Sequence, residues 1–359
     1  MNTPRARVLI MAGGTGGHVY PGLAVARELL ARGCEVAWLG TAAGLEAKLV
    51  QDAGIELHFI QVRGLRGNGL FGWLAAPVAI AQAVLEAASV LARWRPTVVL
   101  GLGGFASGPG GLAATLKRIP LVVHEQNARP GLTNRVLAKI ATRVLDAFPN
   151  SLVRSKDALV CGNPVRAEIA AVAQYIAPRE NELRRVLVIG GSQGATFLNE
   201  SVPQAIARLE SSPAVNVVHQ CGAAHAQATR ASYAIAGVEA TIVPYLENMT
   251  DAFAAAHLVI ARSGAMTVTE LAACGRPAFL VPYPYAVDDH QMHNANYLVQ
   301  RGAAKCCAQT SLSVAEFASE LSALINSPET LADMALAARA AFVPNADVRV
   351  ADHCCEVAK

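Results

Sequence analysis

The sequence predicts an α/β protein with two doubly wound domains, each built on a parallel β-sheet. Short apolar runs alternate with helical stretches, as in βα units joined by right-handed crossovers. The runs are continuously apolar, which suits strands covered by helices on both faces. A strand followed by a glycine cluster occurs at residues 8–17 and again at 186–194. A chain of 359 residues is long enough for two cores.

The first domain is expected over residues 1–163. A helix from Val19 to Arg32 should follow the first glycine cluster, and the junction falls near Gly162-Asn163-Pro164 because a residue before proline is pushed out of helix. The six runs of strand length are residues 8–11, 36–40, 57–62, 98–103, 121–124 and 143–148.

The most membrane-like segment is Leu74 to Ala92, which contains Pro77 and Glu86. A membrane-spanning helix needs about 20 mostly apolar residues with few charges, and this segment falls short. We expect a packed core helix. The alternative is a helix whose outer face touches a membrane surface.

The second domain is expected over residues 164–344, followed by a helix at about 345–359 that could pack back on the first domain. A polar, proline-containing stretch from Gln174 to Glu182 is expected as a surface loop near its start. The strand-length runs of this domain lie within residues 186–194, 215–220, 240–245, 258–264 and 278–283.

Composition and charge narrow the class of protein. The eight cysteines include the adjacent pairs Cys306-Cys307 and Cys354-Cys355 and show no zinc spacing, which favours reduced thiols inside a cell. The apolar run at the start is too short for a secretory signal, so we expect a first strand there. Residues 1–163 hold 17 Lys/Arg against 9 Asp/Glu. This basic half suggests an anionic partner, such as phosphate, a lipid headgroup or nucleic acid.

The first glycine cluster, Gly13 to Gly17, stands between a strand and a helix, where backbone amides favour an anion. It departs from the dinucleotide fingerprint, because Val19 stands where the third glycine belongs. The second strand ends in Leu39-Gly40-Thr41, without an acid to hold a ribose. No Walker loop occurs either. We therefore predict no cofactor.

His18 follows this cluster at the carboxyl end of the first strand, where α/β sheets bind ligands. A lone histidine is more often structural. At this position, however, its imidazole suits a general base, because it can accept a hydroxyl proton near pH 7.

The second domain carries a matching pair of motifs. Gly190 to Ala195 forms a second phosphate-type loop, and Arg262 precedes a glycine turn and a helix start. Thr267 and Glu270 have the spacing of a helix capping box, which is the structural interpretation. The functional interpretation is a Glu270 carboxylate that accepts two ribose hydroxyls, while Arg262 and the helix start take a diphosphate.

Seven motifs in register resemble the MurG family of glycosyltransferases over essentially the whole chain. They are GGTGGHVYPGLA, GLGGFASGPGG, HEQNARPGLTN, GNPVR, GGSQGA, RSGAMTVTE and DDHQMHNA. The resemblance implies the GT-B architecture, two Rossmann-like domains facing a cleft. It also implies inverting transfer of N-acetylglucosamine from UDP-N-acetylglucosamine to the 4-hydroxyl of undecaprenyl-pyrophosphoryl-muramoyl pentapeptide, in peptidoglycan synthesis, cell shape and division.

The resemblance also implies roles for single residues. His18 would be the base, with Glu125 or Asn127 assisting or positioning. Phe105 departs from the family, which often has tyrosine there, so any role of a hydroxyl at this position is in doubt. The residues expected to bind substrate are Thr15, Gly16, Gly17 and Asn127 near the donor, Arg166, Ser192 and Arg262 at the diphosphate, Leu246 at the uracil, Ala265, Met266, Thr267, Val268, Thr269 and Glu270 at phosphate and ribose, and Gln291 at the sugar.

The expected partners are UDP-N-acetylglucosamine, the undecaprenyl-linked acceptor, an anionic membrane surface and proteins of cell-wall synthesis, with no nucleic acid. The chain has no Asp-x-Asp motif, so we expect catalysis without a metal. We expect a peripheral protein at the cytoplasmic face of the inner membrane, unless Phe71 and Trp73 are simply buried. The membrane-facing residues would be Leu70, Phe71, Trp73 and Leu74 with Arg63, Arg66, Lys117 and Lys139.

Two functions of other classes remain open on the sequence alone. One is a UDP-sugar epimerase or a related GT-B enzyme that acts on a soluble sugar. The other is a noncatalytic protein that binds nucleotide sugar or lipid.

Overall fold

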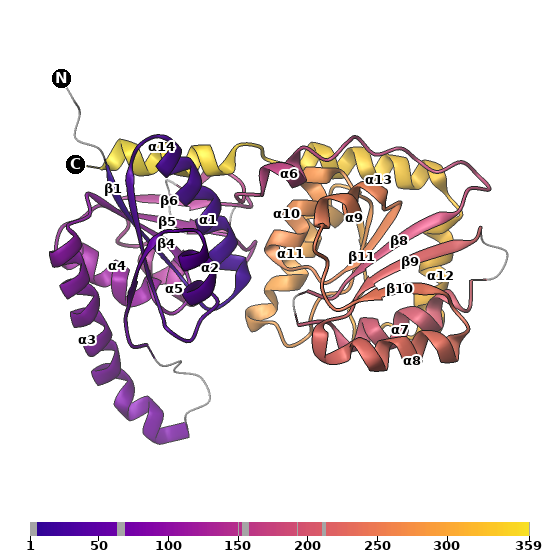
Figure 1. Cartoon of the computed structure of the whole chain (residues 1–359), viewed down its shortest axis with the longest axis horizontal. Helices are drawn as coiled ribbons and strands as arrows, with labels where there is room; N and C mark the ends of the chain where they lie inside the picture. Colours follow the sequence, from indigo (N-terminus) through magenta and orange to yellow (C-terminus); the bar gives the residue numbers. More distant parts are fainter. Residues whose placement is uncertain are drawn as a thin grey trace. The chain divides into compact units, whose positions relative to one another are not determined.

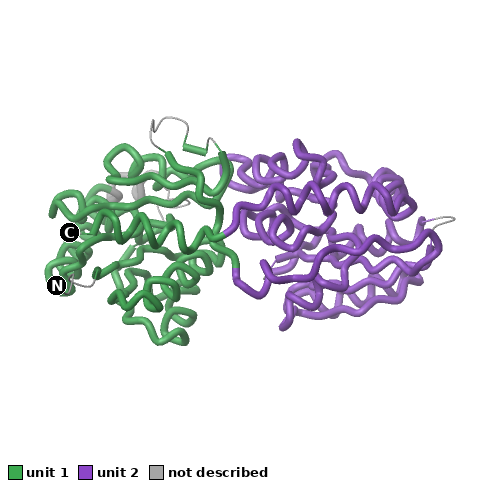
Figure 2. The backbone as a smooth tube through the Cα atoms, turned by 90° about the horizontal axis from the view of Figure 1, so that it is seen from above, with its two compact units in different colours: residues 1–165, 345–359 green, residues 166–344 purple. Residues whose placement is uncertain are grey.

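The structure is a computed structural model that describes residues 6–62, 69–149, 151–152, 158–191, 193–209 and 213–358, and for residues 69–76 the backbone alone. The chain forms two compact units (Figure 2). Unit 1 contains residues 1–165 and 345–359, and unit 2 contains residues 166–344. The chain thus leaves unit 1 after Val165 and returns to it after Pro344.

Unit 1 is built on a seven-stranded sheet whose paired strands are all parallel, in the order β3-β2-β1-β4-β5-β6-β7. The strands are β1 Arg7–Ala12, β2 Glu35–Gly40, β3 Glu56–Phe59, β4 Val98–Gly103, β5 Leu121–Glu125, β6 Arg143–Asp146 and β7 Ala158–Val160. The six expected runs overlap β1 to β6 in chain order. The short edge strand β7 was not predicted.

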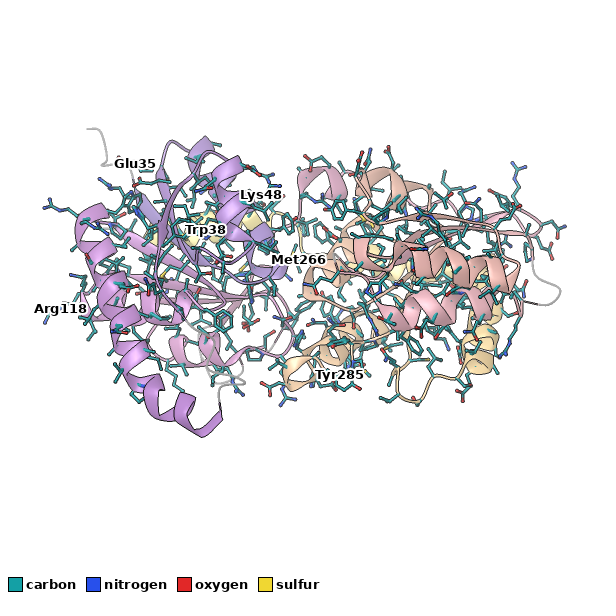
Figure 3. All side chains as sticks on the ribbon, turned by 60° about the horizontal axis from the view of Figure 1, so that its bottom comes forward. Glu35, Trp38, Lys48, Arg118, Met266 and Tyr285 are labelled. Carbon is teal, nitrogen blue, oxygen red and sulfur yellow. The ribbon has the colours of Figure 1, made fainter. Side chains whose placement is uncertain are left out.

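Helices cover both faces of this sheet (Figure 1). The core contains Trp38, which is fully buried (Figure 3) and donates its indole N–H to the Ala12 carbonyl at 2.8 Å. The helices are α1 Gly16–Ala31, α2 Glu46–Asp52, α3 Gly69–Trp94, α4 Ser107–Leu116, α5 Leu132–Leu137 and α14 Ala346–Val357.

Helix α1 begins three residues earlier than the sequence predicted, inside the glycine cluster. Its N-cap is Thr15, so Gly16, Gly17 and His18 form its first turn. Glycine has a low helix propensity, but its cost applies to the interior of a helix. Gly16 and Gly17 stand in the first turn, directly after β1, so they do not prevent the helix from starting there. His18 therefore sits on a helix and not in a loop.

Helix α3 packs one face in the core and exposes apolar side chains on the other. Ala87, Val90 and Leu91 are buried in the core of unit 1. Val78 and Leu85 are 63% and 70% exposed. Within the described residues, no helix has the length and apolar character needed to cross a membrane.

Unit 2 is built on a six-stranded sheet, also parallel throughout its pairings, in the order β10-β9-β8-β11-β12-β13. The strands are β8 Arg184–Ile189, β9 Val215–Gln220, β10 Ala240–Val243, β11 Leu258–Ala261, β12 Ala278–Leu280 and β13 Ala304–Cys306. The helices are α6 Ala167–Ala170, α7 Thr196–Ile206, α8 Ala226–Ala236, α9 Met249–Ala255, α10 Ala265–Cys274, α11 His290–Val299, α12 Val314–Ile325 and α13 Pro328–Ala341, with 3-10 turns at Ala223–His225 and Val287–Asp289. Strand β13 was not predicted.

Two buried arginines hold the start of unit 2 against its body. Arg184 donates to the carbonyls of Glu180 and Ile325, both at 2.8 Å. Arg276 donates to the carbonyls of Phe253 and Ala173. These hydrogen bonds tie the expected surface loop to the rest of unit 2.

Helix α14 returns to unit 1 and completes its core. Val350, Ala351 and Cys354 are fully buried and pack in the same cluster as residues of α1 and of the sheet. Arg32 of unit 1 forms an ion pair with Asp352 at 2.7 Å. The C-terminal segment is therefore part of unit 1.

Candidate active site

The predicted residues of unit 1 gather at the carboxyl ends of β1, β4 and β5. These three strands are neighbours, and the order of the sheet reverses between β1 and β4. Open α/β sheets bind ligands at such a switch point. The register shifts there as well, so that Ala12 pairs with Gly103.

The glycine cluster is held in place by Glu46, a fully buried residue at the start of α2. Its carboxylate accepts from the Gly14 amide at 3.0 Å and from the amide and hydroxyl of Thr41 at 2.9 and 2.8 Å. A Cβ on Gly13 or Gly44 would collide with this carboxylate. An acid thus does lie near the end of β2, although none was expected, and its oxygens serve the loop.

His18 is half-buried, and its ring lies against the backbone of Gly103. A Cβ on Gly103 would lie 3.0 Å from His18 Cε1, and its φ of +97° also favours glycine. Nδ1 of His18 lies 2.8 Å from Oε1 of Gln126. Within the described residues, its Nε2 has no hydrogen-bond partner, so this nitrogen can meet a substrate.

Glu125 is buried and saturated with hydrogen bonds at the end of β5. It accepts from the amide and side chain of Asn127 at 2.8 and 3.1 Å, from the Gly131 amide at 3.2 Å and from the Asn134 side chain at 3.0 Å. A carboxylate with these four donors positions Asn127. This arrangement favours the positioning alternative over direct proton transfer.

Thr15 and Phe105 follow the strands β1 and β4, and both have exposed side chains. Thr15 is exposed, and its side chain makes no capping hydrogen bond to α1. Phe105 is 55% exposed. The first amides of α1, those of Gly16 and Gly17, lack intrahelical partners by the geometry of a helix start.

In unit 2, the motif-bearing loops follow β8 and β11, which are adjacent where that sheet reverses its order. Gly191 and Gly194 have φ of +86° and +79° in the first loop. The second loop leads into α10, whose N-cap is Gly264 with no side-chain hydrogen bond. Ser192 lies outside the described residues.

The capping-box interpretation of Thr267 and Glu270 is wrong. The helix begins at Ala265, so Thr267 is its third residue and cannot be the cap. Gly264 stands at the N-cap position and has no side chain, so no side chain caps the first amides of α10.

The predicted binding residues of α10 fall into two groups, buried and half-buried. Ala265, Val268 and Thr269 are buried, and the Thr269 hydroxyl donates to the Ala265 carbonyl at 2.8 Å. Ala265 can still offer its backbone amide to a ligand, because it is the first residue of the helix. The Val268 amide already donates to the Gly264 carbonyl at 3.0 Å. Met266 (Figure 3), Thr267 and Glu270 are half-buried and can offer side chains.

Glu270 and Arg166 are brought together at 3.4 Å. The side chain of Glu270 is only 15% exposed, whereas that of Arg166 is 42% exposed. Burial raises the pKa of Glu270, and the charge of Arg166 partly opposes this. A buried acceptor beside a more accessible cation suits hydroxyl and phosphate groups of one ligand.

Arg262 is engaged inside unit 2. It donates to the carbonyls of Val281 and Pro282 at 2.9 and 3.1 Å and to Gln309 at 2.7 Å. Its guanidinium also lies over the ring of Tyr283. Most of its donors are therefore used within the fold.

Gln291 and Leu246 lie on other parts of the same unit. The Gln291 side-chain oxygen accepts from the Tyr283 amide at 2.9 Å, which leaves its NH₂ group for a ligand. Leu246 is half-buried in the segment between β10 and α9.

Three residues near His18 or its loop were missed from the sequence: Glu46, His124 and Gln126. His124 and Gln126 are in the HEQN motif, but only their neighbours were selected, because the sequence gives no sign of which side chains they contact. Among the described residues, no group of three or more His, Cys, Asp or Glu side chains could hold a metal ion.

Comparison with protein families assigns both halves of the chain. Residues 8–146 match the glycosyltransferase family 28 N-terminal domain, and residues 185–350 match the glycosyltransferase family 28 C-terminal domain.

Individual proteins match over nearly the full length. The chain is 50% identical to the UDP-N-acetylglucosamine–N-acetylmuramyl-(pentapeptide) pyrophosphoryl-undecaprenol N-acetylglucosamine transferase of Pseudomonas paraeruginosa, over 99% of each sequence. The crystal structure of MurG from Acinetobacter baumannii superposes with a TM-score of 0.85 at 38% identity, covering 98% of this chain and 99% of that one. A UDP-GlcNAc 2-epimerase from Neisseria meningitidis shares the fold, with a TM-score of 0.68 at 15% identity over 98% of this chain and all of its own.

Proposed function

This chain belongs to glycosyltransferase family 28, and from this premise we propose that it transfers N-acetylglucosamine from UDP-N-acetylglucosamine to undecaprenyl-pyrophosphoryl-muramoyl pentapeptide. The transfer makes the disaccharide-lipid precursor of peptidoglycan. The observation that carries this function is the full-length match to transferases named for that reaction.

The donor half of the reaction is assigned to unit 2. The first amides of α10 and the positive end of its dipole suit the diphosphate of UDP. Glu270 accepts the ribose hydroxyls, and Arg166, 3.4 Å from it, is placed to neutralise phosphate. The free NH₂ of Gln291 suits a sugar hydroxyl.

The base is assigned to His18 in unit 1. Its Nε2 takes the proton of the acceptor 4-hydroxyl as the oxygen forms a bond to C1 of N-acetylglucosamine. The bond from C1 to the phosphate oxygen breaks at the same time, and UDP leaves with the electron pair. A single displacement of this kind turns the α-linked donor into a β-linked product.

The negative charge that develops on UDP is stabilised by fixed donors. Backbone amides at a helix start act without reorganising and contribute several kcal/mol. We therefore expect that the reaction proceeds after exhaustive chelation of divalent cations on a water-soluble acceptor. Loss of activity restored only by Mg²⁺ or Mn²⁺ would contradict this assignment.

Transfer of radiolabelled N-acetylglucosamine to the lipid acceptor tests the function. Labelled disaccharide-lipid is the expected product. Release of epimerised nucleotide sugar would instead indicate a sugar epimerase, the alternative that shares the fold. Binding of UDP-N-acetylglucosamine with neither product would indicate a noncatalytic binding protein.

His18→Ala tests the base. We expect kcat to fall by about 10²- to 10⁴-fold, the typical contribution of general acid–base catalysis, with little change in donor affinity. His353→Ala, which changes a half-buried histidine of α14 outside the candidate site, is the matched control. A collapse of donor affinity with normal residual kcat would assign His18 to ligand positioning.

We further propose that unit 1 docks on the cytoplasmic leaflet of a membrane that holds the lipid acceptor. An apolar hollow lies between α3 and α4, with Leu85 and Leu116 70% and 76% exposed beside it. The exposed cations Lys117, Arg118 (Figure 3) and Lys139 lie next to this hollow in sequence. A basic residue near an anionic leaflet contributes about 1 kcal/mol, which suits anionic phospholipid as the partner.

Several residues predicted to face the membrane lie outside the described side chains. They are Arg63, Arg66, Leu70, Phe71, Trp73 and Leu74. The membrane proposal rests on the described part of α3 and on α4.

Vesicle binding tests the membrane proposal. We expect the double variant Leu85→Ser, Leu116→Ser to bind vesicles of phosphatidylglycerol more weakly and to keep its affinity for UDP. Leu336→Ser, which is 61% exposed in unit 2, is the control. Equal vesicle binding by a folded double variant would exclude this surface.

A further inference from the structure

Three hydrogen bonds in series connect the Gly162 carbonyl to the ring of His18 through His124 and Gln126. The Gly162 carbonyl lies 2.8 Å from Nε2 of His124. Nδ1 of His124 lies 2.9 Å from Nε2 of Gln126, and Oε1 of Gln126 lies 2.8 Å from Nδ1 of His18. His124 and Gln126 are buried, at 0% and 1% exposure, so water does not compete for these bonds.

The chemistry of each group fixes where the protons are, beginning at His124. A carbonyl oxygen can only accept, so Nε2 of His124 carries a proton toward Gly162. Burial lowers the pKa of His124 to about 4, which leaves its ring neutral near pH 7. Nδ1 of His124 therefore carries a lone pair.

Gln126 has one orientation that satisfies its surroundings. Its amide nitrogen faces two acceptors, Nδ1 and the carbonyl oxygen of His124, at 2.9 and 3.0 Å. Both amide protons are thereby used, and the amide oxygen must face His18. Asn163 holds the Gln126 backbone by donating to its carbonyl at 2.9 Å.

We propose that Gln126 is a positioning residue that keeps a proton on Nδ1 of His18 and leaves Nε2 as the atom that exchanges protons. An amide oxygen cannot donate, so Nδ1 of His18 must be the donor. The ring also lies close to Gly103, where an added Cβ would come within 3.0 Å of its Cε1 atom. The catalytic consequence rests on the proposed function of His18 as the base.

The tautomer decides whether His18 can act. With the proton on Nδ1, Nε2 offers a lone pair to the acceptor hydroxyl. With the proton on Nε2, the ring would present an N–H group to that hydroxyl and could not take its proton. In serine proteases an aspartate holds the histidine tautomer in this way. Here a neutral amide does so, and adds no charge beside the base.

Nitrogen NMR of the histidine rings tests the tautomer in the intact protein. The chain has nine histidines, so the signals of His18 are identified in ¹⁵N-histidine-labelled protein by their loss in His18→Gln. At about pH 8, where an ordinary histidine is neutral, we expect protonated Nδ1 and unprotonated Nε2. An Nε2–H tautomer in the wild-type protein would overturn the proposal without any Gln126 variant.

Gln126→Met then separates positioning from packing. We expect a mixture of both His18 tautomers, a fall in kcat of about 10- to 100-fold as for other residues that orient a functional histidine, and an unchanged KM for UDP-N-acetylglucosamine. Gln51→Met, the same change on the exposed face of α2, should leave the His18 tautomer and kcat unchanged. Gln126→Glu keeps an acceptor toward His18 and should retain the Nδ1–H tautomer.

The outcomes distinguish this inference from the proposed base. If Gln126→Met leaves His18 fully in the Nδ1–H tautomer, the positioning role is excluded. If His18→Gln retains full turnover while the wild-type tautomer is as stated, the base assignment fails and the series of hydrogen bonds stands.

Discussion

Glu125 is a buried carboxylate that matters to the candidate site without facing a substrate. Its four donors come from Asn127 and Gly131, in the segment between β5 and α5, and from Asn134 in α5, so it holds that segment and the start of α5 around itself. Asn127, held by two of these bonds, is the member of the pair that can face a ligand. Replacing Glu125 would therefore change the shape of the site before it changed any proton transfer.

Glu270→Gln should raise KM for UDP-N-acetylglucosamine about tenfold, because hydrogen bonds to a charged group are stronger by about 1 kcal/mol or more. The ligand-free protein should melt at the same temperature or higher, since burial already penalises the charged form of Glu270. Arg166 keeps access to water in this variant.

Steady-state kinetics and thermal melting check this prediction, with Glu168→Gln on the exposed part of α6 as the control. A lower melting temperature with unchanged KM would show that Glu270 serves the fold alone.

Asp146 predicts a pH dependence of stability. It is 1% exposed at the end of β6, and burial raises its pKa from 3.8 to about 6. The folded state thus holds its proton more tightly than the unfolded state. The contribution of protonated Asp146 to the free energy of unfolding is fully present below about pH 4 and is lost as the pH rises through about 6.

Asp146→Asn removes this dependence. Between about pH 4 and 7, the free energy of unfolding of the variant should improve relative to wild type by up to about 3 kcal/mol. Urea unfolding at both pH values measures this difference. Asp52→Asn, which is exposed, should show no such change.

Which residues the sequence could reveal depends on how local their partners are. His18 and Glu270 were selected as candidates because of their place after a strand or near a helix start. Gln126 and Glu46 were missed because their partners lie 108 and 32 residues away. A pattern along the chain cannot indicate a contact that only the folded sheet creates.

The loop between β1 and α1 shows how two neighbouring βα connections share one anchor. Glu46 belongs to α2, yet it binds the amide of Gly14 in the connection before it. The same carboxylate binds Thr41 at the end of β2. The position of the glycine loop is therefore set from outside the loop.

Glu46→Gln should lower the free energy of unfolding by about 1–3 kcal/mol, because an amide has one acceptor oxygen and would turn its NH₂ toward a donor. Turnover should fall as the loop before His18 loses its anchor, while UDP binding by unit 2 stays normal. The measurements are urea unfolding and kcat. The control is Glu35→Gln (Figure 3), whose side chain is 57% exposed. Stability equal to that of the control would contradict the anchor.

Most elements could be predicted, and the errors were at ends and edges. Continuous apolar runs identified the central strands of both sheets, because such strands must be covered on both faces. The edge strands β7 and β13 have three residues each and give no such signal. The start of α1 was misplaced because glycine normally marks a loop.

Unit 1 is discontinuous in sequence, with the whole of unit 2 inserted before α14. Val350→Asp places an uncompensated charge in the core of unit 1, where Val350 is fully buried. We expect hydrogen exchange to accelerate in the strands of unit 1 and to stay slow in those of unit 2. Glu356→Gln, on the exposed side of the same helix, is the control. Uniform loss of protection in both units would show that they unfold together.

This insertion sets the order in which a ribosome can complete the two cores. Residues 1–165 emerge first, but the apolar surface that α14 covers stays open until unit 2 has been made. At about 5–20 residues per second, this interval lasts roughly 10 to 40 seconds. Unit 2 can fold as soon as it leaves the exit tunnel, whereas the earlier half of the nascent chain waits with an exposed apolar face, open to aggregation or to a chaperone.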